Sequence, residues 1–312
     1  MRVLLERNNV NPNAVDKDGQ TPLSGAVEDG HEGVVRILAE QSGVNLNTTN
    51  NGYGQTPLSL AAENGHEGVV SILLERSDLN PNIADQYDQT PLYLAAEGGF
   101  EGVVRMLLGR NDVNPDTADE DGQTPLSSAA ENGYEGVVRM LLERSGVNPN
   151  TADRNGQTPL FLAAKNGHEG VVGILLGRND VNLDTADIWG ETPLSLAVRQ
   201  GHGRVVRMLL ERNGVNPNTA NNCGRTPLSW AAGNGYRQIV EILLGRNDIN
   251  LDITDHNGQT ATEWAAHNGY GRIAELLRDQ AASRPSQMPT PPPTHTPYSI
   301  ICVPFNQLCI YP

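Results

Sequence analysis

Aromatic side chains make up only 4% of the 312 residues, and cysteine occurs three times. A hydrophobic core must therefore be built mainly from Ala, Leu, Val and Ile. No apolar run approaches the ~20 residues that a membrane-spanning helix needs. The start of the chain is charged and lacks the apolar stretch of a secretory signal. With so few cysteines, these absences favour the cytoplasm, or alternatively the nucleus, and indicate no association with membranes.

Lysine is nearly missing, since only Lys17 and Lys165 occur, and the formal net charge is −15. A protein this acidic repels phosphate backbones and anionic lipid surfaces, so we expect no nucleic-acid partner. If charge guides an encounter, the partner is a protein with a basic surface. The other interpretation, which remains open, is that the acidity only keeps a long molecule in solution.

Recognisable catalytic motifs are also lacking. The sequence contains no phosphate-binding Gly-x-x-x-x-Gly-Lys-Ser/Thr loop, no His-Glu-x-x-His and no Gly-x-Ser-x-Gly. Cys302 and Cys309 have no nearby histidine, which argues against a metal site. Four histidines share one slot that holds Phe or Tyr elsewhere, which indicates packing. We therefore predict a protein that is not an enzyme and has no cofactor, metal or catalytic residue.

The tripeptide Thr-Pro-Leu recurs at a nearly constant spacing. A degraded eighth copy begins at Thr260, and successive spacings are 35 and then 34 residues. The seven intact copies begin at Thr21, Thr56, Thr90, Thr124, Thr158, Thr192 and Thr226. A fixed period of this size is typical of stacked-repeat proteins, whose units each contact their neighbours along a solenoid. Such molecules present a long surface, which favours binding over chemistry.

One unit shows how the repeat folds. Thr158 is a predicted helix N-cap, and Pro159 suits the first helical position because it has no N–H to leave unpaired. A helix is expected over 159–166, ending at Gly167, where a left-handed residue is favoured. A second helix is expected over 170–176. The apolar residues recur at helical spacing, so the fold class is all-α.

The repeat divides the chain into three parts. Residues 1–15 match the second half of a unit and are predicted to be a truncated N-terminal half-repeat. This half-repeat lacks a polar cap. We therefore expect the protein to be a monomer, or to self-associate weakly through this uncapped end. Residues 281–312 form a Pro-rich tail that we expect to be disordered. Between them we predict eight repeats at about 16–49, 50–84, 85–118, 119–152, 153–186, 187–220, 221–254 and 255–280.

The unit resembles the ankyrin repeat. The shared pattern is Asp-x-x-Gly-x-Thr-Pro-Leu-x-x-Ala-Ala-x-x-Gly-His, followed by Val-Val, Leu-Leu and Val-Asn. The resemblance implies helix–turn–helix units with projecting β-turn or hairpin fingers, stacked into a curved array. The near-identical units and the truncated start also resemble the repeat arrays that belong to larger NACHT-type signalling proteins. The period of 34 departs from the ~33 of the family.

Positions that vary between otherwise similar units are candidates for binding a protein. By resemblance, the residues after the opening Asp or Asn lie at finger tips, and the residue after Ala-Ala lines a concave helix face. The latter is acidic in early repeats and basic or neutral later. The candidates at the tips are Tyr53, Tyr87, Glu120, Asp121, Arg154, Ile188 and Trp189. The candidates at the helix ends are Glu97, Glu131, Lys165 and Arg199, and those at the helix starts are Tyr93, Phe161, Trp230 and Trp264.

The leading functional hypothesis is a non-enzymatic scaffold that binds another protein. An alternative follows from the resemblance, because the Asn of Val-Asn can be hydroxylated by an asparaginyl hydroxylase in ankyrin proteins. The candidate positions are Asn80, Asn114, Asn148, Asn182 and Asn216. Against modification stands a structural interpretation, in which each Asn hydrogen-bonds the connector of its neighbour. A third possibility is a passive spacer rod with no partner.

Overall fold

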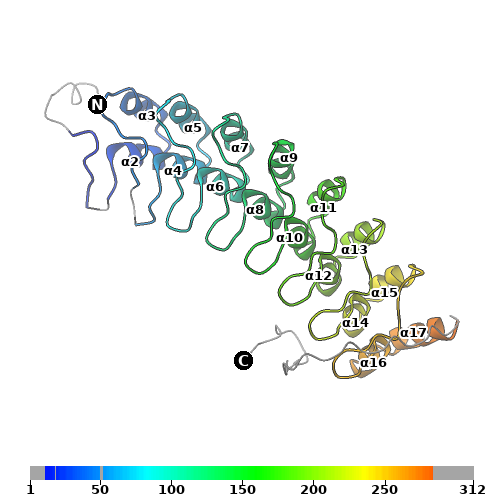
Figure 1. Cartoon of the computed structure of the whole chain (residues 1–312). Coiled ribbons are helices and arrows are strands. Elements are labelled where there is room, and N and C mark those ends of the chain that lie inside the picture. Colours follow the sequence, from blue (N-terminus) through cyan, green and yellow to red (C-terminus); the bar gives the residue numbers. More distant parts are fainter. Residues whose placement is uncertain (1–10, 18, 50–51, 284–312) are drawn as a thin grey trace. The chain divides into compact units, whose positions relative to one another are not determined.

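The protein is all-helical in the part of the chain that the computed structural model describes, namely residues 11–17, 19–49 and 52–283. These residues contain helices α2 to α17 and no strand. The chain divides into two compact units, residues 1–154 and 155–312. Each unit repeats one motif, a short first helix, a tight turn and a second helix, as Figure 1 shows. The all-α repeat fold predicted from the sequence is confirmed.

In unit 1, fingers, first helices and second helices form three parallel rows (Figure 1). Neighbouring first helices pack side by side, and so do neighbouring second helices. The four helix pairs are α2 (Pro22–Glu28) with α3 (Glu32–Ala39), α4 (Pro57–Glu63) with α5 (Glu67–Leu74), α6 (Pro91–Glu97) with α7 (Glu101–Leu108), and α8 (Pro125–Asn132) with α9 (Glu135–Glu143).

Unit 2 follows the same plan. Its four pairs are α10 (Pro159–Asn166) with α11 (Glu169–Leu176), α12 (Pro193–Gln200) with α13 (Gly203–Leu210), α14 (Pro227–Gly233) with α15 (Arg237–Leu244), and α16 (Ala261–His267) with α17 (Gly271–Ser283). One helix pair begins within each of the eight predicted repeats.

The sequence signals place the helix ends correctly. The Thr158 hydroxyl accepts a hydrogen bond from the Phe161 N–H at 3.3 Å, and Pro159 is the first residue of α10. The helix ends at Gly167, which has φ of 76°. The second helix begins at Glu169, one residue before the predicted start. A threonine in extended conformation precedes every described first helix in the same way, which fixes the register of each repeat.

Rings at the start of the second helices join neighbouring repeats. A side chain added at Gly65 would meet the Phe100 ring at 2.5 Å, and one added at Gly99 would meet the Tyr134 ring at 2.8 Å. Both glycines also have positive φ, so they are needed for space and for conformation. His66 occupies the same slot, and its Nε2 donates to the carbonyl of Glu28 at 3.1 Å. The packing interpretation of this slot is therefore confirmed.

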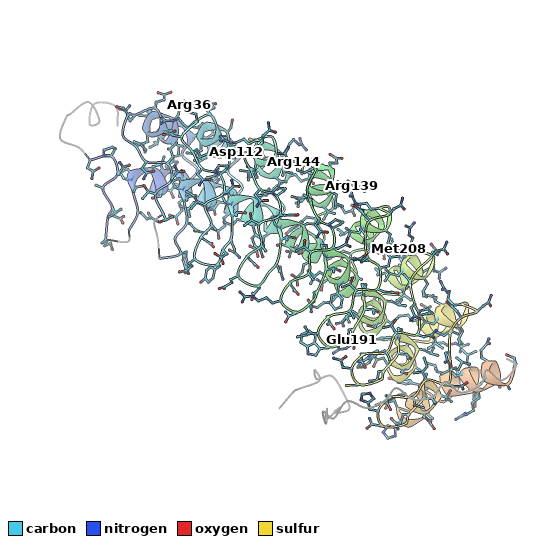
Figure 2. The ribbon with its side chains drawn as sticks, in the orientation of Figure 1. Arg36, Asp112, Arg139, Arg144, Glu191 and Met208 are labelled. Atoms are coloured by element: carbon cyan, nitrogen blue, oxygen red, sulfur yellow. The ribbon has the colours of Figure 1, made fainter. Side chains whose placement is uncertain are left out.

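Arginines at the ends of second helices also connect successive repeats. Arg110 holds both oxygens of Asp112, at 2.9 and 2.6 Å, and donates to the carbonyl of Leu74 in the preceding repeat at 3.2 Å. Arg144 in turn donates to the carbonyl of Arg110 at 3.0 Å; Asp112 and Arg144 are labelled in Figure 2. These contacts satisfy carbonyls that a helix end leaves unpaired. Arg110 also lowers the pKa of Asp112, chiefly through their hydrogen bond.

Several expectations need correction or fall outside the described residues. Helix α17 reaches Ser283, so the first three residues assigned to the tail are helical. Residues 1–10 of the predicted half-repeat and residues 284–312 of the predicted tail lie outside the described residues. In the part that is described, no helix is long and apolar enough to cross a membrane.

Candidate functional site

The finger tips are held in register by hydrogen bonds within and between repeats. The Oδ1 of Asp85 accepts from the backbone N–H groups of Tyr87 and Gln89, both at 2.9 Å. Backbone bonds then link consecutive fingers, from the Gln86 N–H to the Tyr53 carbonyl at 2.9 Å and from the Glu120 N–H to the Tyr87 carbonyl at 2.9 Å. The varied side chains are therefore presented from a fixed backbone.

Most predicted tip residues are exposed. Tyr53, Tyr87 and Ile188 are large hydrophobic residues with 55%, 40% and 51% of their surface exposed. Trp189 is half-buried, and the charged tips Glu120, Asp121 and Arg154 are exposed. Apolar side chains at turn tips add nothing to a core, so these positions are suited to contacting another molecule.

The first helices of unit 1 end in a row of acidic side chains. Glutamine amides orient them: the Gln55 Nε2 donates to Glu63 Oε2 at 2.7 Å, and the Gln123 Nε2 donates to Glu131 Oε2 at 3.2 Å. The pKa of Glu97 is raised by partial burial first, and then by four surrounding carboxylates, Asp119, Glu63, Asp85 and Glu131. The acids along this row therefore repel one another, which indicates a strongly negative local potential.

A groove opens between this row and the fingers. It has a volume of about 360 Å³, and its lining combines acids, amides and two tyrosines: Glu28, Tyr53, Gln55, Leu60, Glu63, Asn64, Asp85, Tyr87 and Gln89. The Tyr53 and Tyr87 rings lie 6.5 Å apart between centroids and are tilted by 33°. None of the lining residues is a lysine or arginine.

The corresponding face of unit 2 contains a stack of arginine and tryptophan side chains. The Arg225 guanidinium lies 3.6 Å from the Trp230 ring centroid and 4.1 Å from that of Trp264. Arg199 lies 5.0 Å from the Trp230 centroid. The Trp264 Nε1 donates to Asp255 Oδ2 at 3.0 Å. Arg199 and Arg225 are thus bound to rings within the chain, an interaction that connects the last three repeats.

Three of the predicted binding residues are buried. Tyr93, Phe161 and Trp264 have exposures of 3%, 1% and 9%, so they do not form a surface that a partner can reach. Burial is the main cause that raises the pKa of Tyr93, and a hydrogen bond with Asp119 adds to it. These residues pack the array and are not part of the candidate site. Lys165, Arg199 and Trp230 are half-buried.

The candidate modification sites organise the connectors between repeats. In four of them the Oδ1 accepts a hydrogen bond from the backbone N–H two residues later; these are Asn80, Asn114, Asn148 and Asn216. All five candidates, Asn182 included, are exposed. The bond to the neighbouring repeat comes from a different residue: Asn82 Oδ1 accepts from the Asn114 N–H at 2.9 Å, and its Nδ2 donates to the Asp112 carbonyl at 2.6 Å. The predicted hydrogen bond to the neighbour is therefore real, but it is made two residues further along.

Aspartate replaces asparagine in two steps of this ladder. Asp116 Oδ2 accepts from the Asn148 N–H at 2.9 Å, and Asp184 Oδ2 accepts from the Asn216 N–H at 2.7 Å. The Oδ1 of each has no hydrogen-bond partner in the described part of the chain. Burial raises the pKa of both carboxyls, opposed by the backbone hydrogen bond. A carboxylate cannot donate a hydrogen bond as the asparagine amide does. The links that Asp116 and Asp184 make to the next repeat are therefore weaker at neutral pH than those made by asparagine.

Sequence reasoning missed Arg225 and the glutamine row. The signal was present as two linked departures from the repeat pattern: Arg225 stands where six of the other seven units have glutamine, and eight residues later Gly233 replaces a longer side chain. A side chain added at Gly233 would meet an Arg225 nitrogen at 2.9 Å. The described residues contain no group of three or more His, Cys, Asp or Glu able to hold a metal ion.

Comparison with known proteins agrees with the repeat structure. A family model described as ankyrin repeats (3 copies) matches residues 1–85, 77–153, 144–221 and 213–287. The solved ankyrin repeat domain of Bcl-3, a member of the IkappaB protein family, aligns with 30% sequence identity and a TM-score of 0.63. The alignment covers 73% of this chain and 99% of that one. A search of curated proteins found no match. The chain belongs to the ankyrin repeat family.

Proposed function

We propose that this chain is a non-enzymatic scaffold that binds a protein partner through its finger tips and the adjoining ends of the first helices. Ankyrin repeats are generally protein-interaction modules, and the solved relative fits that role. The observation that carries the proposal is the exposure of Tyr53, Tyr87 and Ile188 on tips whose backbone is fixed. Rigid, exposed aromatic and aliphatic side chains are effective interface anchors because they lose little conformational freedom on binding.

The partner that fits best has a basic surface. The acidic row and groove of unit 1 would attract it, and the net charge of −15 would speed its approach. Two arginines of unit 2, Arg199 and Arg225, are stacked on tryptophan rings, so they compete less with this attraction. We place the interaction in the cytoplasm or nucleus. The exposed Val-Asn side chains already have a role in their own turns, and hydroxylation there stays an untested alternative.

Replacing both Tyr87 and Ile188 by serine should weaken capture of the partner at least tenfold, because each anchor contributes on the order of 1 kcal/mol or more. The melting temperature should stay within a degree or two, since both side chains are exposed. Quantitative affinity capture with purified bait, together with thermal melting, measures both effects.

Tyr134→Ser is the matched control. Tyr134 is exposed to a similar degree, at 37%, but it lies at the start of α9 and away from the tips. Its ring packs beside Gly99 of the preceding repeat, so the capture is compared at a temperature at which thermal melting shows this variant to be folded. This variant should capture the partner as the parent chain does. Equal capture by the Tyr87→Ser/Ile188→Ser variant would contradict the finger-tip surface. If neither the parent nor any variant captures a protein, the passive spacer is the better description.

A further inference from the structure

We propose that the unit 1 groove between the fingers of Tyr53 and Tyr87 binds the guanidinium group of an arginine side chain from the partner. This inference rests on the proposed function, because the arginine belongs to the protein that the scaffold recognises. It adds a specific subsite: a planar cation beside two tyrosine rings, with carboxylates on the wall formed by the first helices.

The groove has the size and lining for such a group. Its volume of about 360 Å³ accommodates a side-chain head group, and it is lined by Tyr53 and Tyr87 on one side and by Glu28, Glu63 and Asp85 among the rest. Guanidinium binds best where an aromatic face and a carboxylate are offered together, since it stacks on the first and donates to the second.

The groove is also preorganised. The Gln86 N–H to Tyr53 carbonyl bond, at 2.9 Å, ties the two fingers together and sets the spacing of their rings. The Glu63 carboxylate is oriented by Gln55 at 2.7 Å. One oxygen of Asp85 is engaged with the backbone of its own finger, which fixes that carboxylate in place. A ligand therefore meets side chains that need little rearrangement.

Unit 2 supplies an internal precedent. Arg225 extends from the position before the helix-capping threonine, and its guanidinium lies 3.6 Å from the Trp230 ring centroid and 4.1 Å from that of Trp264. The Trp264 indole in turn donates to the buried carboxylate of Asp255. In unit 1 the equivalent positions are the glutamines Gln55 and Gln89, and the groove lining contains no cation. The rings of the unit 1 groove come from the fingers and not from the first helices, but the groove likewise combines aromatic rings with carboxylates, and its lining holds no arginine.

The electrostatics of the surroundings favour a cation over a neutral group. The carboxylates of Glu63 and Asp85 both raise the pKa of the adjacent Glu97, which shows that their charges act along the row. A bound guanidinium would relieve this repulsion. Lysine would be attracted by the same charges, but its ammonium lacks the planar face that stacks on tyrosine. The subsite should therefore prefer arginine.

The test uses the full chain with ¹³C-labelled tyrosine rings and three peptides. Each is Gly-Ser-Gly-X-Gly-Ser-Gly, with arginine, lysine or citrulline as X. Titration followed by NMR should shift the ring signals of Tyr53 and Tyr87 with the arginine peptide. The lysine peptide should bind at least about threefold more weakly, and neutral citrulline at least about tenfold more weakly. Shifts of equal size with citrulline, or none at either ring with arginine, would overturn the proposal.

Two substitutions with the same charge change separate the groove from general attraction. Glu63→Gln removes a groove carboxylate, whereas Glu143→Gln removes an exposed one at the end of α9. We expect Glu63→Gln to weaken the arginine peptide at least threefold and Glu143→Gln to leave it within experimental error. Equal weakening by both would show that net charge alone attracts the peptide.

Failure of this inference is distinguishable from failure of the proposed function. If the arginine peptide leaves both rings unshifted while the tip variant still loses the captured partner, the arginine subsite is wrong and the scaffold stands. If the peptide binds in the groove but no protein is captured, the subsite stands and the scaffold function is wrong.

Discussion

Replacing Phe161 by alanine should lower the free energy of unfolding by about 3–5 kcal/mol. Phe161 is only 1% exposed and is the largest of the fully buried side chains. It lies on α10 among residues that are themselves buried, so the helix cannot easily collapse around the space left behind. The effect combines the lost burial of the ring with a cavity in a tightly packed array. Urea denaturation measured by circular dichroism would give the change.

Two further variants make this result diagnostic. Phe161→Leu keeps most of the volume and should cost less than half as much. Ile188→Ser removes an apolar side chain that is 51% exposed, and its effect should stay within about 0.5 kcal/mol. A loss below about 1 kcal/mol for Phe161→Ala would contradict its placement in the core. It would also restore Phe161 as a candidate for contacting a partner.

Replacing Glu191 by glutamine should stabilise the protein at pH 7 by about 1–3 kcal/mol. Glu191 is only 4% exposed, and Figure 2 marks its place in the array. Its Oε1 accepts from the Asn221 Nδ2 at 2.8 Å, but its Oε2 has no hydrogen-bond partner within the described residues. Glutamine keeps the acceptor for Asn221 and removes the buried charge. Six of the other seven repeats carry glutamine at this position.

The gain in stability from Glu191→Gln should depend on pH because the charge of Glu191 acts on the nearby carboxyl of Asp187. Burial is the main cause that raises the pKa of Asp187 from 3.8 to about 6, and the charge of Glu191 adds to the rise. The folded protein thus holds this proton more tightly than the unfolded chain. Its contribution to stability is complete below pH 3.8 and is lost as the pH rises through about 6. In Glu191→Gln, which lacks the Glu191 charge, the stability lost as Asp187 ionises is smaller.

Denaturation of both proteins at pH 4.5 and pH 7.5 tests this account. The advantage of Glu191→Gln should be larger at the higher pH. Glu143→Gln provides the control, since it makes the same chemical change at an exposed position and should alter stability little at either pH. Destabilisation by Glu191→Gln at neutral pH would show that the carboxylate has a favourable partner that this structure does not contain.

The repeating residues of the sequence were enough to predict the fold. Thr158 with Pro159 defined where a first helix begins, and Gly167 defined where it ends, because capping and left-handed turns depend on local chemistry. The exposed tips were also found, since Tyr87 and Ile188 follow the opening residue of a turn. Helix ends and exposed turn tips depend on local chemistry, so the sequence of one repeat was enough to predict them.

The errors arose where neighbouring repeats determine the environment. Tyr93 and Phe161 were named as contact residues because their position varies between otherwise similar units. In unit 2, α10 packs against the first helix α12 and against its own second helix α11, and six consecutive residues of α10 are buried. The stack of Arg225 on Trp230 and Trp264 joins residues from two repeats. It could not be inferred from one repeat alone.

The central claim is that the repeated residues hold the units together while the varied tips contact a partner. Site-specific photo-crosslinking tests it most directly, with the crosslinker placed at Tyr87 in one protein and at Arg139, exposed on the second-helix face, in another. We predict a covalent adduct with one defined protein from Tyr87 and none from Arg139. Adducts from Arg139 with none from Tyr87 would contradict the claim.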